Sequence, residues 1–186
     1  MRSAWVLGLL FMAASAAAAA AAPPLWRVDY YHSKLQFIAS QAGAEFTGGF
    51  DRFQAEIRFS KSDLEHSSAR VSIPTGTVNT RNGERDAALS GADWFDVEHY
   101  PVAVFSADNF ERLNARDYRA SGSLTVRDTT QPVNLVFQVQ QAKGTAHLTG
   151  EATLNRLAFG LGTGEWADDK LIGIRVKVKV DLYASY

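Results

Sequence analysis

A strict two-residue alternation of apolar and polar side chains near the C-terminal end limits the folds open to this chain. From Ile172 to Leu182 every second residue is apolar, and the residues between them are Gly, Arg, Lys, Lys and Asp. The same alternation runs through Phe53–Ser60. Because successive side chains of a strand point to opposite faces of a sheet, both segments predict β-strands with one buried and one solvated face.

Further short segments rich in β-branched and aromatic residues predict more strands of the same kind. They lie at residues 25–31, 34–42, 70–78, 102–109, 118–126, 133–140 and 146–154. Turn signals separate most of them: Arg127–Pro132 is a polar loop closed by proline, Ala142–Gly144 suits a hairpin turn, and Gly48–Gly49 marks a bend or bulge. Eight or nine sequential strands with short connections predict an antiparallel sheet.

A sheet of this size must either curl shut or split into two packed layers. A sandwich would usually need long crossover connections, whereas the chain has one long non-strand insertion. The prediction is therefore an all-β fold: a single antiparallel up-and-down β-barrel of about eight strands.

The long insertion, Asn79–Pro101, interrupts the strand pattern. It opens with charged residues, continues through a short helical run at Asp86–Leu89, and then carries Trp94 and Phe95. We expect this segment to pack at one end of the barrel and to present charge beside apolar surface.

The predicted inward faces combine large and small side chains. An eight-stranded barrel is either filled by its side chains or just wide enough for one small ligand. The alternation specifies burial and not a cavity, so a tapering solid core and a hollow barrel both remain open. The large inward residues are Phe37, Phe53, Ile57, Phe59, Leu124, Phe137 and Leu148, and the small ones are Ala55, Ala120, Gly122, Ala146, Gly150 and Ala152.

The N-terminal residues have the pattern of a secretory signal peptide. Arg2 precedes an apolar core at Trp5–Met12 and a run of alanines. We predict a cleaved signal peptide at residues 1–22 and one barrel domain at residues 23–186. The chain has no cysteine, so a disulfide framework is excluded, and an exported protein of this kind fits the bacterial periplasm. The net charge of -1 gives no basic surface for nucleic acid.

Asp29, His32 and Ser33 lie close together and raise the hypothesis of a hydrolase. They lack the G-x-S-x-G elbow, and the preferred interpretation is that Asp29 and Ser33 satisfy backbone groups at a turn. The other histidines are scattered, so no metal site is predicted.

Arg85 and Asp86 allow two interpretations. In the first, they pair with each other or cap a helical turn, as such neighbours commonly do. Alternatively, Arg81 and Arg85 at a barrel mouth would hold an anionic or carbonyl head group while an apolar tail lies inside.

Five ordered motifs carry a family likeness that runs from Trp26 to about Leu182. They read WRVDYYHSKLQF, GGFDRFQAEIRFS, T-x(4)-RD-x(2)-L-x(4)-WFDVEHYPVAVF, SGSLTVRDTTQPVNL and RLAFGLGTGEW. Together they resemble the YceI-like polyisoprenoid-binding family. The resemblance implies a periplasmic, lipocalin-like barrel that holds an isoprenoid or quinone-like lipid as a carrier rather than a catalyst.

Carried over by position, the family's motifs fall on three groups of residues. The chain departs from the family pattern at Trp94, where phenylalanine is usual, and in the Arg127–Val133 loop. FGLGTGEW resembles the branch found beside or fused to membrane di-haem b-type cytochromes, which implies quinone handling. The matched positions are Asp29, His32 and Ser33; Thr80, Arg85 and Asp86; and Trp94, Phe95, Asp96, Tyr100 and Pro101.

The leading hypothesis is a periplasmic carrier that binds a polyisoprenoid or isoprenoid-quinone-like lipid non-covalently, without another cofactor or a metal. An enzyme acting on a lipid head group is one alternative. A solid-barrel interaction module that docks to the cytochrome through Trp94 and Trp166 is another, and a homodimer is left open. The predicted apolar lining is Phe37, Phe53, Ile57, Phe59, Leu124, Phe137, Leu148, Trp94 and Phe95, and the predicted polar mouth is Arg81, Arg85, Asp86 and His32.

Overall fold

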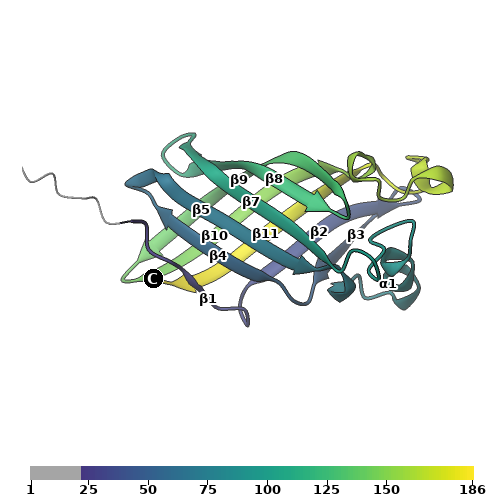
Figure 1. The fold of residues 1–186 in the computed structure, drawn as a ribbon, viewed down its shortest axis with the longest axis horizontal. Helices are drawn as coiled ribbons and strands as arrows, with labels where there is room; N and C mark the ends of the chain where they lie inside the picture. Colours follow the sequence, from purple (N-terminus) through teal and green to yellow (C-terminus); the bar gives the residue numbers. More distant parts are fainter. Residues whose placement is uncertain (1–21) are drawn as a thin grey trace, which may run out of the picture.

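The structure is a computed structural model that describes residues 22–186. All of the predicted signal peptide except its last residue lies outside this range. The described part is one curled antiparallel sheet with a single α-helix at one end (Figure 1). Its strands are β1 (Arg27–Val28), β2 (Lys34–Gln41), β3 (Ala44–Phe50), β4 (Gln54–Ser60), β5 (Asp63–Pro74), β6 (Val78–Asn79), β7 (Val102–Arg112), β8 (Asp117–Val126), β9 (Thr129–Ala142), β10 (Thr145–Asn155) and β11 (Arg175–Ser185).

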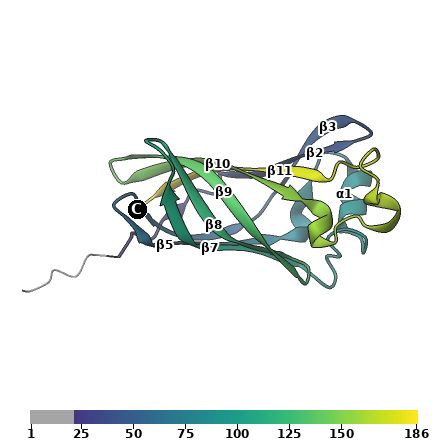
Figure 2. The same ribbon diagram turned by 90° about the horizontal axis from the view of Figure 1, so that it is seen from above.

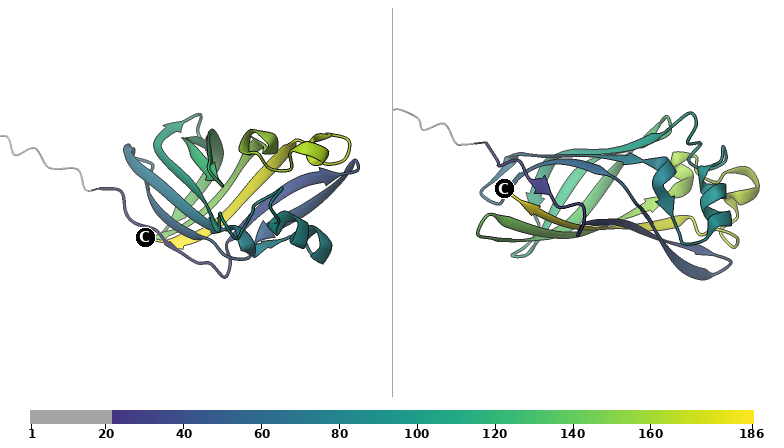
Figure 3. Two further views of the ribbon diagram at one scale, coloured as in Figure 1. Left: turned by 45° about the vertical axis from the view of Figure 1, so that its right-hand side comes forward. Right: turned by 90° about the horizontal axis from the view of Figure 1, so that it is seen from below.

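The pairing order confirms the predicted up-and-down antiparallel architecture. It runs β4-β5-β7-β8-β9-β10-β11-β2-β3-β6, with β1 added to β11. The strands wrap around a common interior (Figure 3). The described residues form eleven strands rather than about eight. The predicted strand at 25–31 is reduced to the two-residue β1, the predicted segment at 70–78 ends at a separate two-residue strand, β6, and β3 was not predicted.

The strand β3 was missed because its Gly48–Gly49 pair suggests a bend. In the structure Gly48 pairs with Phe37 across β2 and β3. A Cβ atom at Gly48 would lie 2.4 Å from the Phe37 ring, so glycine leaves room for that ring. The glycine therefore serves the packing of the sheet rather than its termination.

The N-terminal segment closes the sheet at the end that carries the C-terminus. The Trp26 amide donates to the Ile57 carbonyl of β4 at 2.8 Å, while Arg27 and Val28 pair with β11. Residues 25–28 thus lie between two strands that are otherwise separate. We call this end the closed end, and the opposite end, which carries α1 (Gly83–Ser90), the helix end (Figures 1 and 2).

The predicted helix in the insertion is confirmed and is longer than predicted. It begins at Gly83 because Asn82 acts as its N-cap: the Asn82 side chain accepts a hydrogen bond from the Arg85 amide at 2.9 Å. Three 3₁₀ turns complete the connections: η1 (Thr75–Thr77), η2 (Arg156–Phe159) and η3 (Gly164–Ala167). The last two lie at the same end of the molecule as α1 (Figure 1).

Candidate ligand-binding cavity

A cavity of about 420 Å³ occupies the interior of the barrel. Its walls reach from Phe59 and Leu182, towards the closed end, to Trp94, Trp166 and Ile172 at the helix end. The barrel is therefore hollow along much of its length, and the solid-core interpretation is wrong. Side chains from almost every long strand contribute to the walls, because each strand turns alternate residues inward.

Every residue of the predicted apolar lining faces this cavity. Contact with a ligand stays a prediction. The alternation predicted the inward direction of the residues in the strand segments, whereas Trp94 and Phe95 reach the cavity from the insertion. They are Phe37, Phe53, Ile57, Phe59, Leu124, Phe137, Leu148, Trp94 and Phe95.

Two of the small inward residues, Ala120 and Ala152, line the cavity as well. The others do not. At Gly150, for example, a Cβ atom would lie 2.9 Å from the Phe137 Cβ, so the neighbouring strand already fills the space. The hollow thus depends on small side chains at particular positions opposite large ones.

Arg85 is the one predicted polar residue that lines the cavity, and it lies at the helix end. Its guanidinium stands 3.8 Å from the centre of the Phe46 ring, and its Nε donates to the Gln41 side chain at 3.2 Å. Gln41, Asn82 and Glu84 line the same region. In place of the predicted set, we use the name polar mouth from here on for the four residues that line this region, Gln41, Asn82, Glu84 and Arg85.

The structure does not bring the other three predicted mouth residues to the cavity. One Asp86 carboxylate oxygen accepts hydrogen bonds from the Thr80 amide at 2.8 Å and the Thr80 hydroxyl at 2.6 Å, which ties the helix to the preceding strand. Arg81 is exposed in a turn with φ of 59°. His32 lies on the β1–β2 turn beside Tyr183. None of the three therefore lines the cavity, and their contact with a ligand stays a prediction that this geometry does not support.

The Asp29–Ser33 segment forms the turn that the preferred interpretation predicted. Asp29 accepts hydrogen bonds from the Tyr31 amide at 3.1 Å and contacts His32 Nδ1 at 2.6 Å. The hydrogen bond from His32 lowers the pKa of Asp29. The Ser33 hydroxyl accepts from the Tyr183 amide at 2.9 Å, so it is engaged with the backbone of β11 and not with His32.

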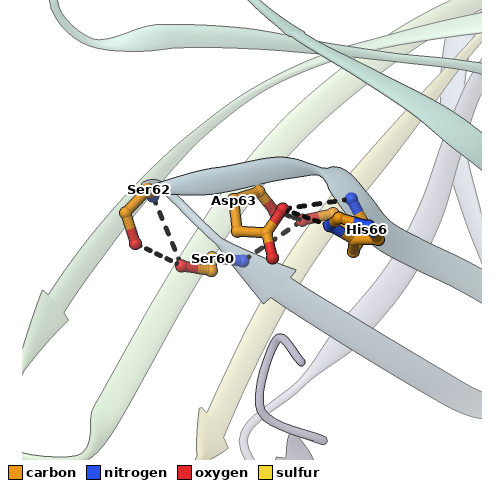
Figure 4. A network of polar contacts seen from close by, with 5 residues as sticks. Ser60, Ser62, Asp63 and His66 are labelled. Carbon is orange, nitrogen blue, oxygen red and sulfur yellow. Dashed lines mark hydrogen bonds and ion pairs between the residues drawn. The ribbon is translucent and has the colours of Figure 1, made fainter. Parts of the chain in front are cut away.

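Each of the four histidines contacts an aspartate. His66 lies 2.7 Å from Asp63 at the β4–β5 turn (Figure 4), and His99 lies 2.8 Å from Asp96. These hydrogen bonds raise the pKa of His66 and of His99. The third D-x-x-H pair is Asp29 with His32, and His147 contacts Asp181 across two strands. Residues 22–186 contain no group of three or more potential protein ligands arranged for a metal ion.

Arg156 is a wall residue that sequence reasoning missed. Only 3 % of it is exposed, and it stands over the Trp94 ring with 5.3 Å between the guanidinium carbon and the ring centre. Its guanidinium donates to five backbone carbonyls, and burial lowers its pKa. The acceptors are Gly173 at 3.1 Å, Leu161 at 2.8 Å, Trp166 at 2.6 Å, Ile172 at 2.8 Å and Gly162.

These bonds make Arg156 the anchor of the loop between β10 and β11. The same loop meets the insertion at Gly162, whose amide donates to the Asp93 carbonyl at 2.7 Å. Trp94 and Trp166 then lie with their ring centres 6.4 Å apart, and both line the cavity. Two segments far apart in sequence therefore close the helix end together.

In the described part of the chain, no helix has the length and apolar character needed to cross a bilayer.

Comparisons with known proteins agree with this geometry. The YceI-like domain family matches residues 26–184. A UPF0312 protein of Pectobacterium carotovorum is 30% identical over 105 residues, which cover 56% of this chain and 54% of that protein. A UPF0312 protein of Pseudomonas aeruginosa is 28% identical over 137 residues, with 70% and 71% covered. The match thus spans about half the length of the first of these relatives.

Solved structures share the fold. The crystal structure of Burkholderia cenocepacia BcnA superposes with a TM-score of 0.82 and 28% identity, covering 86% of this chain and 100% of BcnA. A polyisoprenoid binding domain from Saccharophagus degradans gives a TM-score of 0.66 and 16% identity, with 86% and 97% covered. The match over residues 26–184 is almost the whole described part, and the chain belongs to the YceI-like domain family.

Proposed function

We propose that this protein is a carrier that sequesters the apolar chain of a polyisoprenoid or isoprenoid-quinone-like lipid inside its barrel. The observation that carries the proposal is the elongated cavity with almost wholly apolar walls. Burial of apolar surface contributes about 0.8 kcal/mol per methylene group, so a partly enclosed chain would bind tightly without a charged contact.

The family relationship supports the same class of ligand. The Saccharophagus degradans domain with this fold is described as polyisoprenoid binding. The branched, unsaturated chain of an isoprenoid is long and narrow, and the cavity of this protein is likewise elongated along the barrel.

The polar mouth would meet a polar group at the outer end of the bound chain. Arg85 is half-buried there, with its Nε on Gln41 and its face on Phe46. A neutral or anionic oxygen is the partner that suits a guanidinium and amide groups.

A carrier fits the arrangement of the polar side chains better than an enzyme does. The groups that the head-group enzyme hypothesis would use lie apart: His32 contacts Asp29 in the β1–β2 turn, whereas Arg85 and Asp86 lie in α1 and are hydrogen-bonded to Gln41 and Thr80. General acid–base chemistry needs its groups within hydrogen-bond reach of one substrate. We further propose a periplasmic location, which the predicted signal peptide supports, and a membrane b-type cytochrome as a candidate partner.

Organic extraction of the protein purified from its native host, followed by mass spectrometry, tests the proposal. We expect a long-chain isoprenoid in stoichiometric amount, and uptake of added isoprenoid quinone by the delipidated protein. Repeated extraction without any lipid, together with no uptake of added quinone, would contradict it.

A further inference from the structure

Two hydrogen-bond donors are buried at the closed end of the barrel without a partner in the described part of the chain. They are the indole Nε1 of Trp26 and the hydroxyl of Tyr118, and these residues are 2 % and 1 % exposed. Burying an unsatisfied polar group costs about 1–3 kcal/mol. Two such groups at one end of the barrel are hydrogen-bond donors that an acceptor reaching them would satisfy.

A third unsatisfied atom differs from these two. Arg127 Nε lies at the helix end, in a guanidinium whose Nη1 already contacts the carbonyls of Trp94 and Gly160 at 3.4 Å. Trp26 and Tyr118 have one side-chain donor each, and the structure gives neither of them a hydrogen-bond partner.

The two donors flank the inner wall of the cavity. The Trp26 ring stands edge-on to the Phe59 ring with 5.9 Å between centres, and the Tyr118 ring does the same at 5.6 Å. Tyr118 also stacks on Phe137 at 5.6 Å. Because Phe59 and Phe137 both line the cavity, one aromatic ring separates each donor residue from it.

The surroundings favour an uncharged acceptor. The rings packed on both donors are aromatic, so a buried carboxylate or phosphate would lack a counter-charge. The nearby cation, Arg112, lies 5.6 Å over the Tyr118 ring, but its guanidinium donates to the carbonyls of Asn114 and Ala115. A ketone, quinone carbonyl or ether oxygen would satisfy such a donor without that cost.

We infer that the closed end is a polar subsite in which Trp26 Nε1–H and Tyr118 O–H each offer a hydrogen bond to uncharged oxygen atoms at the inner end of the bound chain. Access requires the Phe59 ring to turn aside. The inference rests on the proposed function and narrows it to chains that carry an uncharged oxygen at the end that reaches Trp26 and Tyr118, in addition to any polar group that the other end presents to the polar mouth.

The affinities of two probes for the delipidated protein test the subsite. Farnesylacetone carries a ketone at one end of an isoprenoid chain, and an isoprenoid hydrocarbon of matched length carries none. Tyr118→Phe, which removes one oxygen and keeps the packed ring, should weaken farnesylacetone binding about 3- to 10-fold and leave hydrocarbon binding unchanged. Tyr183→Phe is the matched control, because Tyr183 is 39 % exposed and lies outside the cavity lining.

The indole signal of Trp26 gives a second readout. In a ¹H–¹⁵N spectrum, assigned with Trp26→Phe, this signal should move downfield with farnesylacetone and not with the hydrocarbon. An equal loss of both probes in Tyr118→Phe, no loss of either, or an unmoved indole signal would overturn the subsite alone. If wild-type protein takes up neither probe, the proposed function fails together with it.

Discussion

Arg156 shows how one side chain organises the helix end. A buried guanidinium is tolerated here because five backbone carbonyls surround it, and these same bonds fix the β10–β11 loop against Trp94. A cation without this set of acceptors would not remain buried.

Replacement of Arg156 by methionine should lower the free energy of unfolding by about 3 kcal/mol or more, since several charge-assisted hydrogen bonds are lost and buried carbonyls are left without donors. Denaturant unfolding measures this loss. Arg175→Met, at an exposed position of β11, is the control and should cost little. Equal, small losses in both variants would show that the carbonyl cluster does not hold the loop.

The aspartate–histidine pairs give the stability a defined pH dependence. The pKa of His66 and of His99 is raised above 6.5 in the folded protein. Their contribution is therefore fully present below the unfolded pKa and is lost as the pH rises through the folded pKa. The His66→Gln/His99→Gln variant should differ from wild type in unfolding free energy more at about pH 5.5 than at about pH 8.5. A difference that grows toward alkaline pH would contradict the assignment.

At the scale of elements, α1 forms part of the cavity wall, and its hydrogen bonds and packing fix its position. Asp86 ties it to Thr80, which is 6 % exposed, while Leu89 packs on the cluster of Phe37, Ala39 and Val78. The Asp86 carboxylate thus bonds to Thr80 and does not line the cavity.

Asp86→Asn should destabilise the protein by about 1–2 kcal/mol, because a charge-assisted acceptor of two hydrogen bonds is weakened. Lipid affinity should change little. Asp93→Asn, an exposed carboxylate in the following loop, serves as the charge-matched control. Calorimetric unfolding together with a lipid-binding titration separates the two effects. A large loss of lipid affinity with unchanged stability would show instead that Asp86 contacts the lipid at the helix end.

The elements also show how far the sequence alone leads. The alternation in Ile172–Leu182 and Phe53–Ser60 predicted the inward faces, because a period of two leaves only one choice of buried side. The alternation did not predict β3, because Gly48 suggests a bend. Its role is to leave room for the Phe37 ring of the neighbouring strand, and the sequence does not show this contact. The role of Arg156 was equally hidden, because its acceptors are carbonyls that carry no residue-type signal.

For the whole molecule, the sequence did not decide between a hollow and a solid barrel. The packing of the side chains decides it. Small side chains such as Ala120 and Ala152 line the space between large ones, and whether neighbours fill that space depends on strand register and barrel curvature. The same register places Phe59 between the cavity and the buried donors Trp26 and Tyr118. The molecule is thus a tube closed at one end and covered at the other by two interlocked loops.

Uptake of an isoprenoid quinone by a cavity-filled variant tests the central role of this tube most directly. Ala152→Phe places a large ring inside the cavity, and Thr153→Phe places the same ring on the exposed face of the same strand. With both variants shown to be folded by their unfolding transitions, we expect Ala152→Phe to bind the quinone about 10-fold or more weakly and Thr153→Phe to bind it as wild type does. Wild-type affinity in Ala152→Phe would show that the bound chain does not lie in the barrel.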